Sequence, residues 1–394
     1  MSSHNETNGT PRTEAFETVI IGGGQAGLAV GYHLMRRNQP FVILDAGARV
    51  GDSWRGRWDS LRLFTPARYS GLPGMRFPAP GWTFPTKDEM GDYLESYAIR
   101  FGLPVRTEVS VDRLSREGDG YLLECADGAR IHADRVVVAS GAHRTPKVPP
   151  FGADLDPRIV QLHSSEYRNP AQLEDGGVLV AGVGNSGAEI AFELSRSHPI
   201  ALSGKESGQI PVRHGSLPFR FVVRVIRFLG SHVLTKRTPI GRRVGPKAAA
   251  NAAPLIRVRS KELAERGVER VARVAGVRGG RPLLADGRVL DVANVVWCTG
   301  YVHDFSWLDL PVLDETGQPV HERGVATASP GLYFAGLVFQ FAATSDVLPG
   351  IGRDAGYVAK HIARQAAKGG RPVRLPEPAR RHAWPSPELS RSTE

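Results

Sequence analysis

The sequence predicts an α/β fold with two Rossmann-like dinucleotide-binding domains, because one glycine pattern occurs twice in the same setting. The first copy, 22–27, follows the apolar run 19–21 and opens a helical stretch. The second copy, 182–187, follows 178–181 and also precedes a helical run. The glycines permit a tight turn and let a pyrophosphate approach the N-terminus of the helix. The candidate pyrophosphate-binding residues are Gly22, Gly24, Gln25, Ala26 and Gly27 in the first copy and Gly182, Gly184 and Gly187 in the second.

Two such units predict two bound dinucleotides, and the common pairing is a flavin with a nicotinamide. In the first unit, Asp45 ends the strand 41–45, where an acid accepts a hydrogen bond from a ribose hydroxyl. In the second unit, the strand 200–203 ends without a carboxylate, and Lys205 follows it. A missing acid beside a cation favours the 2′-phosphate of NADPH over NADH. An ordinary surface lysine is the alternative for Lys205.

The order of the elements predicts that the second domain is inserted into the first. An apolar strand at 135–139 ends in Ser140-Gly141, and a proline-marked connector follows. A later apolar run, 295–297, ends similarly in Thr299-Gly300, which predicts that the chain returns there to the first domain. A strand at 331–336 and a helix at 351–366 complete it. The expected division is a disordered tail at 1–14, the first part of the FAD domain at 15–150, the NADPH domain at 151–290, the second part of the FAD domain at 291–370 and a disordered tail at 371–394.

Composition excludes several classes of protein. The net charge of the 394-residue chain is +10, but residues 213–259 hold eleven Lys or Arg and no acidic residue, so the rest is nearly neutral. Local charge without a nucleic-acid motif argues against nucleic acid as a partner. No apolar run approaches the roughly 18 residues of a membrane-spanning helix, and no signal peptide is expected. The lone Cys125 and Cys298 fit a cytoplasmic protein and supply neither a redox pair nor a metal site.

The run from Gly51 to Leu63, together with both glycine patterns, 85–98 and Thr299-Gly300-Tyr301, resembles the flavin-containing monooxygenase superfamily. The chain is most similar to its plant auxin-biosynthetic branch and bacterial relatives, over residues 17 to about 366. This resemblance implies FAD and NADPH as cofactors. It implies that Ser53 and Trp54 lie against the isoalloxazine and that a helix N-terminus near Gly350 faces the flavin. It further assigns cofactor contacts to Ser140, Gly141, Asn185, Ser186, Gly187, Thr299, Gly300 and Gly336.

The chain departs from the family pattern at two places. The family's linker motif keeps His163 and Tyr167, but its Phe and Gly positions hold Pro157 and Ile159. Tyr167 argues against the Baeyer–Villiger subgroup, where Trp is usual. Phe64 stands where animal members carry an asparagine near the flavin C4a. These departures predict weaker control of the reaction with O2. His163 is interpreted either as a hydrogen-bonded linker residue or as part of domain closure.

The resemblance implies a monooxygenase that transfers one atom of O2 to a small organic substrate through a C4a-hydroperoxyflavin. A 2-oxo acid such as indole-3-pyruvate, or a soft nitrogen or sulfur nucleophile, is the expected substrate. A flavin-dependent NADPH oxidase or quinone-directed dehydrogenase is the alternative, and a nucleotide-sensing protein without activity is an alternative of another class. A disulfide reductase is disfavoured because it needs a dithiol beside the flavin.

The basic segment 213–259 contains a predicted helix at 219–229. Arg220, Arg224 and Arg227 recur on one face of it, with Phe and Val residues between them. This pattern is typical of a helix that covers a substrate entrance and also of one that lies on a membrane surface. We expect a lid and keep peripheral membrane contact as the alternative.

Overall fold

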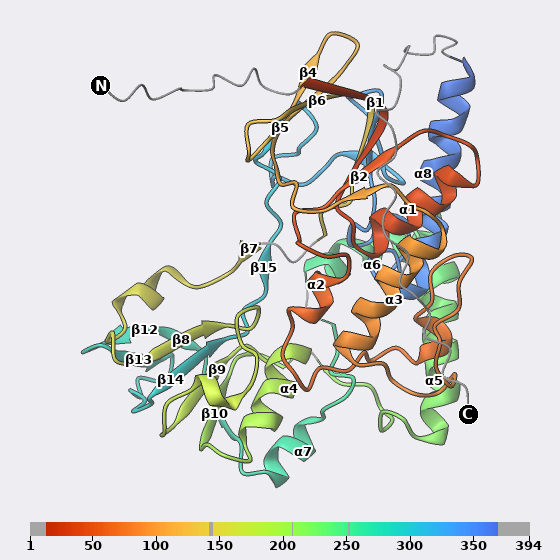
Figure 1. Ribbon diagram of the computed structural model, residues 1–394. Coiled ribbons are helices and arrows are strands. Elements are labelled where there is room, and N and C mark those ends of the chain that lie inside the picture. Colours follow the sequence, from red (N-terminus) through yellow and green to blue (C-terminus); the bar gives the residue numbers. More distant parts are fainter. Residues whose placement is uncertain (1–12, 142–144, 207, 251–252, 369–394) are drawn as a thin grey trace, which may run out of the picture.

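The structure is a computed structural model that describes residues 13–141, 145–206, 208–250 and 253–368. Two sheets form separate layers, each with helices against it (Figure 1). The helices are α1 Gln25–Met35, α2 Asp52–Arg55, α3 Lys87–Arg100, α4 Asn185–Leu194, α5 Leu217–Phe228, α6 Pro239–Ala250, α7 Ser260–Glu265 and α8 Leu348–Lys368. The predicted α/β fold with two Rossmann-like domains is therefore confirmed.

The first sheet carries the order β16-β4-β5-β6-β1-β2-β3, and β19 pairs with β6. Its central strands β2, β1, β6 and β19 run parallel, so their carboxyl ends meet at one edge. The strands are β1 Thr13–Ile21, β2 Val42–Leu44, β3 Val105–Arg106, β4 Val111–Glu117, β5 Gly120–Cys125, β6 Arg130–Val138, β16 Leu308–Asp309, β17 His321–Glu322, β18 Val325–Ala326 and β19 Leu332–Phe334.

Helices α1 and α8 cover one face of the first sheet. Their apolar sides meet in a core cluster that includes Leu28, Leu34, Val358 and Ile362, all fully buried. Helix α3 joins the same cluster through Tyr97. The residues that close this core therefore come from both ends of the chain, as an interrupted domain requires.

The second sheet has the order β11-β10-β9-β14-β8, and its pairings are all parallel. The strands are β8 Val160–His163, β9 Val178–Ala181, β10 Ile200–Ser203, β11 Glu269–Val271 and β14 Asn294–Trp297. The hairpin β12 Val274–Arg278 and β13 Arg281–Leu284 forms a small separate sheet. Helix α4 packs on one face of the larger sheet through Ile190, Ala191 and Leu194.

The predicted return of the chain at 291 is wrong, because β14 belongs to the second sheet, between β8 and β9. The chain crosses back after β14, where β15 Tyr301–Val302 pairs antiparallel with β7 Thr145–Pro146 on the outward crossing. Both crossings therefore run together between the domains (Figure 1). Thr13 and Glu14, predicted as tail, begin β1. The remaining tail predictions, 1–12 and 371–394, lie outside the described residues.

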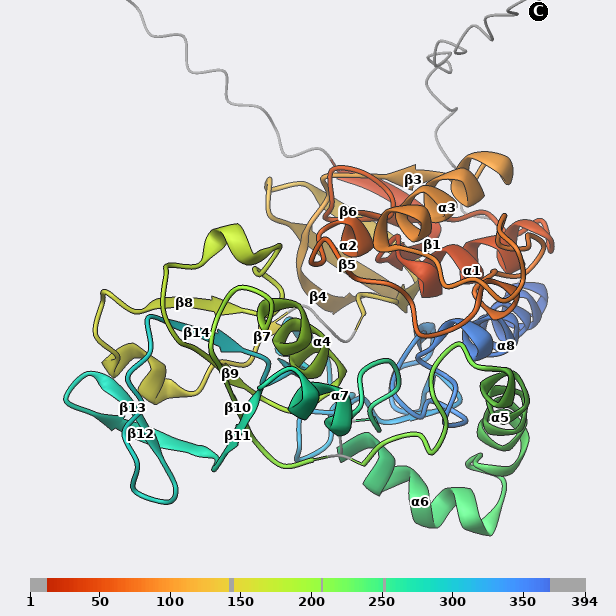
Figure 2. The ribbon, with the colours of Figure 1, turned by 90° about the horizontal axis from the view of Figure 1, so that it is seen from below.

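The basic segment divides between the two domains. Phe219 on α5 contacts the ring of Phe84, and Thr235 bridges to Ala342, so the part around α5 lies against the first domain. The end of the segment packs with the second domain, where Leu255 joins the core beside α4 and Arg257 pairs with Glu189. Figure 2 shows α5 and α6 beside α8, away from the β12–β13 hairpin. The expected helix at 219–229 is α5, which begins two residues earlier than predicted, at Leu217.

Candidate functional site: two nucleotide cradles

The first glycine turn is shaped by backbone contacts that exclude any side chain. Gly22 has φ +110°, and an added Cβ would meet the carbonyl of Ala139. A Cβ on Gly27 would meet the carbonyl of Gly22. At Gly24, by contrast, an added Cβ would meet no atom within 4 Å. The chain therefore packs tightly around two of these glycines and leaves open space in front of the third.

The open space at Gly24 adjoins the N-terminus of α1. Gly24 is the N-cap of α1, no side chain caps the helix, and no acidic residue lies in its first turn. The first amide groups and the positive end of the helix dipole are thus available to an anion. The side-chain oxygen Oε1 of Gln25 is buried and has no hydrogen-bond partner among the described residues. This cradle fits the pyrophosphate of FAD.

Asp45 lies beside this cradle, at the end of β2. Its Oδ2 accepts from the Gly23 amide at 2.5 Å and its Oδ1 accepts from the Gly47 amide at 2.9 Å. Two backbone bonds fix the carboxylate at the place where the fold presents an acid to a ribose. Each oxygen keeps a lone pair for a ribose hydroxyl.

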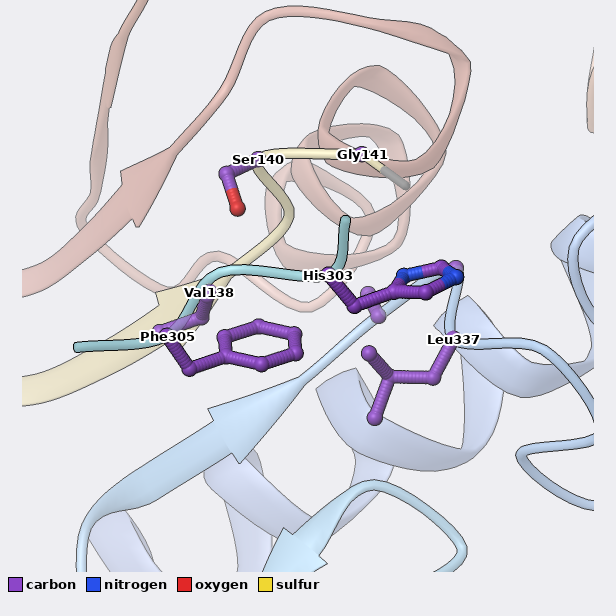
Figure 3. A pocket seen from close by; sticks show the side chains of 8 residues that line it. Val138, Ser140, Gly141, His303, Phe305 and Leu337 are labelled. Atoms are coloured by element: carbon purple, nitrogen blue, oxygen red, sulfur yellow. The ribbon is translucent and has the colours of Figure 1, made fainter. Parts of the chain in front are cut away.

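The carboxyl ends of β6 and β19 continue the same edge. Gly336 has φ +82°, and a Cβ there would lie 2.9 Å from Cβ of Ala26, so the chain after β19 approaches the first turn of α1. A small pocket at this edge is lined by Val138, Ser140, Gly141, His303, Phe305, Ala335, Gly336 and Leu337. Figure 3 shows the side chains of Phe305, His303 and Leu337 around this hollow, next to Ser140 and Gly141. Three of the predicted residues therefore lie together here.

Helix α8 begins at the same side of the domain. Gly350 lies in its first turn, and a Cβ there would meet the backbone of Thr344, so the preceding loop must fold closely over the helix start. Nε2 of Gln25 donates to the carbonyl of Asp346 at 3.4 Å, which joins this loop to α1. Burial raises the pKa of the Asp346 carboxyl. A glycine at position 350 thus allows the preceding loop to pack closely against the start of α8.

Ser53 and Trp54 lie on the short helix α2. Gly51 before it has φ +93°, and a Cβ there would meet the backbone of Gly91, so α2 packs directly on α3. Ser53 is exposed, whereas Trp54 packs partly against the first core. Arg55 anchors the helix through Nη2, which lies 2.8 Å from Oδ1 of Asp92. The predicted isoalloxazine loop is thus held rigidly at its base.

The loop after α2 also joins the two domains. Trp58 is buried in the core of the second domain, and Asn169 Nδ2 donates to Asp59 Oδ2 at 2.8 Å. Arg57 donates to the hydroxyl of Tyr301 at 2.6 Å, on the return crossing. The sequence did not predict these contacts, because nothing around Trp58 distinguishes it from any other tryptophan in a loop.

The second glycine turn repeats the first in detail. Gly182 has φ +121° and faces the backbone of Cys298, Gly187 faces the carbonyl of Gly182, and Gly184 faces open space. Gly184 is the uncapped N-cap of α4, again without an acid in the first turn. The two cradles are therefore equivalent in backbone design, and the second fits the pyrophosphate of NADPH.

Asn185 has a different environment from the one expected. Its Nδ2 donates to the carbonyl of Pro254 at 3.1 Å, and its Oδ1 accepts from the Ile256 amide at 3.0 Å. Both ends of the side-chain amide hold the segment after α6 against α4. The backbone amides of Asn185, Ser186 and Gly187 remain at the helix N-terminus, where a phosphate approaches.

Two cations lie at the end of the second cradle where the sequence predicts the 2′-phosphate of NADPH. Lys205 is exposed just after β10. Arg270, on the neighbouring strand β11, donates to the carbonyls of Leu202 at 3.2 Å and Gly204 at 2.9 Å. Glu206 accepts from the hydroxyl of Ser260 at 3.1 Å and lies 4.0 Å from Nε of Arg270. Sequence reasoning missed Arg270 because only the β10–β11 pairing brings it here.

Thr299 and Gly300 lie in the crossing between the domains. The Thr299 hydroxyl donates to the carbonyl of Lys147, and the Gly300 carbonyl accepts from the Lys147 amide at 3.0 Å. The same carbonyl lies 3.0 Å from Nε2 of His163, which therefore carries the proton. Burial lowers the pKa of His163. His163 is thus a hydrogen-bonded residue beside the crossing between the domains.

The two cysteines lie in different domains. Cys125 ends β5, whereas Cys298 follows β14 beneath the second glycine turn. Burial raises the pKa of the Cys298 thiol to about 12 and that of Cys125 to about 11. Within the described residues, no three His, Cys, Asp or Glu side chains gather as metal ligands. No helix of that described part is long and apolar enough to cross a membrane.

Known proteins are similar in sequence to this chain over most of its length. A family model described as pyridine nucleotide-disulphide oxidoreductase matches residues 19–208. An "Uncharacterized oxidoreductase CzcO-like" of Geobacillus kaustophilus is 38% identical over 88% of this chain and 98% of its own length. The "Probable indole-3-pyruvate monooxygenase YUCCA7" of Arabidopsis thaliana is 30% identical over 76% of this chain and 77% of its own.

A solved structure gives the same result. A mutant of the flavin monooxygenase from Stenotrophomonas maltophilia superposes with a TM-score of 0.71 at 27% identity, over 90% of this chain and 99% of that one. Enzymes of this kind use FAD and NADPH, the two dinucleotides that the cradles fit. The chain therefore belongs to the flavin-containing monooxygenase superfamily, in the part that includes the bacterial CzcO-like oxidoreductases and the plant YUCCA enzymes.

Proposed function

We propose that this enzyme uses NADPH and O2 to transfer one oxygen atom to a small organic substrate. The observation that carries the proposal is the pair of equivalent cradles, each with an open glycine at an uncapped helix N-terminus. The separation of the two cysteines supports oxygen transfer over disulfide reduction, because a disulfide reductase needs two thiols beside its flavin.

The proposed roles follow from the geometry of each group. The amides at the start of α1 bind the FAD pyrophosphate, and Asp45 accepts from the adenosine ribose. The amides at the start of α4 bind the NADPH pyrophosphate, while Lys205 and Arg270 bind the 2′-phosphate. Ser53 and Trp54 lie against the flavin ring, and the start of α8 provides positive potential beside it. Reduced flavin supplies the reactivity towards O2, and the protein positions it and excludes water.

A 2-oxo acid such as indole-3-pyruvate is the proposed substrate, on the basis of the similarity to YUCCA7. In that reaction the 2-oxo acid, O2, NADPH and a proton give the shortened carboxylic acid, CO2, NADP+ and water. A soft nitrogen or sulfur nucleophile is the other substrate class. We place the enzyme in the cytoplasm, where both cysteines would stay reduced.

The test compares oxygen transfer with electron transfer. Purified enzyme is supplied with NADPH, O2 and either indole-3-pyruvate or a thioether, and product is measured per NADPH consumed. The proposal expects one oxygenated product for most NADPH molecules with a true substrate. A dehydrogenase would instead reduce an artificial quinone rapidly under nitrogen. Quinone reduction that outpaces the aerobic reaction with every substrate would refute oxygen transfer.

A further inference from the structure

Helix α5 exposes an apolar stripe to solvent. Its members recur at helical spacing, and their exposed fractions are large: Leu217 73%, Phe221 68%, Val225 38%, Phe228 56% and Leu229 42%. We call these five residues, four on α5 and its C-cap residue Leu229, the exposed stripe. Only Phe219 is buried on this helix. Water-soluble surfaces do not usually group this many large apolar side chains, so the exposed stripe indicates a contact surface.

Arginines flank the stripe and gather around two aromatic rings. The guanidinium carbons of Arg68, Arg220 and Arg224 lie 4.8, 5.3 and 5.4 Å from the centre of the Trp82 ring. Arg227 lies 4.8 Å from the centre of the Tyr69 ring, and its buried Nε has no hydrogen-bond partner. Among the described residues, none of these four arginines has a carboxylate within ion-pair distance.

Such a cluster of cations is costly without anions. Stacking on aromatic rings offsets part of the repulsion between guanidinium groups, while the exposed donors of Arg68, Arg220 and Arg224 remain free to bind an anion. The segment 213–259 contains no acidic residue that could supply the anions from within. An anionic partner that covers the stripe would supply them.

We propose that α5 docks the enzyme onto an anionic membrane surface. The exposed stripe would lie among the lipid chains just below the headgroups, and the arginines beside it would bind lipid phosphates. Trp82 and Tyr69 have the amphipathic rings that favour the headgroup level. The arrangement combines apolar area and positive charge on one helix, which are the two components of interfacial binding.

The charge and the orientation of the stripe distinguish a membrane surface from two alternatives, a second copy of the chain and a lid over the substrate entrance. A second copy of the chain would bring a second acid-free basic segment against the first, and the two would repel. A lid, the interpretation favoured by the sequence, would turn the stripe inward, whereas the structure turns it outward. Of these three, a lipid surface supplies both anionic groups and an apolar layer.

The test is co-sedimentation of the full-length, FAD-loaded enzyme with vesicles. Neutral phosphatidylcholine vesicles are compared with vesicles that contain roughly one third phosphatidylglycerol. Binding is expected on the anionic vesicles at about 0.1 M salt and is expected to fall strongly at about 1 M, where charges are screened. Equal binding to both vesicle types, or no binding, would overturn the proposal.

Paired variants separate charge from apolar contact. Replacing Arg220 and Arg224 by Gln is expected to weaken binding roughly 30-fold, from about 1 kcal/mol for each arginine. The same change at Arg273 and Arg278, exposed near the distant β12–β13 hairpin, keeps the net charge matched and should change binding little. Equal losses in both pairs would show that only net charge matters and would refute docking through α5.

The apolar component is tested with Phe221→Ser. About tenfold weaker binding is expected, because half or more of a phenylalanine side chain leaves lipid contact. Ile99→Ser on α3 is the matched control, since Ile99 is 75% exposed on another part of the surface. Flavin content and circular dichroism verify folding of each variant. NADPH oxidation without vesicles should be unchanged, so this proposal can fail independently of the proposed activity.

Sedimentation velocity tests the remaining occupant. The proposal expects no stripe-dependent self-association in the absence of lipid. A dimer that Phe221→Ser converts to a monomer would identify a second copy of the chain as the partner and overturn the membrane assignment.

Discussion

Alanine at Gly24 is expected to remove FAD while it leaves the protein folded. An added Cβ at this position would meet no atom of the chain within 4 Å, and φ of −77° suits alanine. The methyl group would instead occupy the space in front of α1, where the pyrophosphate must approach. Gly22→Ala and Gly27→Ala differ, because their methyl groups would collide with backbone carbonyls. These two variants are expected to fail in folding.

The size of the effect follows from the bonds that a displaced pyrophosphate loses. A hydrogen bond to a charged group contributes about 1.5–3 kcal/mol, and the start of α1 offers more than one free amide. Loss of two such bonds costs about 3–6 kcal/mol, which weakens FAD binding roughly 100- to 10,000-fold. An enzyme purified without added flavin should then be colourless.

The assay measures FAD content after gel filtration, the Kd for added FAD and the thermal unfolding of the apoprotein. Gly276→Ala in β12 is the control, since a Cβ there also meets nothing within 4 Å. Gly184→Ala makes the equivalent change in the second cradle, and this variant should keep its FAD but show a raised KM for NADPH. A Gly24→Ala protein with full FAD content and an unchanged Kd would refute the assignment of this cradle.

Three further outcomes are expected. Lys205→Ala should lower the ratio of kcat/KM for NADPH to kcat/KM for NADH roughly tenfold. The control variant Lys261→Ala, which changes another exposed lysine, should leave this ratio unchanged. An unchanged ratio in both variants would exclude Lys205 from the 2′-phosphate site. Burial lowers the pKa of His214 to about 4, below its ordinary value, so it stabilises the fold above about pH 6.5 and this stability is lost as the pH falls towards 4. Urea unfolding at about pH 7 and about pH 5 should therefore show a larger fall in the free energy of unfolding for the wild type than for His214→Gln. The difference should reach up to about 2 kcal/mol, less the effect of solvent screening. Parallel pH profiles of the two proteins would contradict this. Without substrate, we expect NADPH to be consumed slowly with release of H2O2, because Phe64, which is 38% exposed, stands where animal members of the superfamily carry an asparagine and has no side-chain amide. NADPH consumption that releases no H2O2 in the absence of substrate would contradict this prediction.

The parts of the site that depend on local backbone geometry could be predicted from the sequence. Gly22 and Gly182 have positive φ and face backbone atoms, so only glycine suits them, and the pattern is visible in the residues alone. Asp45 could be predicted as well, since the carboxylate directly follows its strand; it bonds the amide of Gly47 two residues on and that of Gly23 in the glycine turn. Local rules determine the backbone conformation at these residues, and their contacts with a nucleotide stay a prediction.

Long-range pairing explains what the sequence did not predict. The run 294–297 is an apolar strand like any other, and only its pairing with β8 and β9 assigns it to the second sheet. Arg270 reaches the end of β10 through a strand pairing that no spacing encodes. The side chain of Asn185 matched a nucleotide motif, yet it bonds the backbone of Pro254 and Ile256.

The insertion of one domain into the other sets the order in which they can fold as the chain emerges from the ribosome. The larger sheet of the inserted domain has all its strands once residue 297 is made, because β8 to β11 and β14 lie between 160 and 297. The outer domain must wait for β19 and for α8, whose Val358 and Ile362 cover α1. Until then the apolar face of α1 lacks its partner and is open to wrong contacts. Synthesis therefore completes the sheet of the nicotinamide domain first, and α8, the last of the described helices, closes the flavin domain.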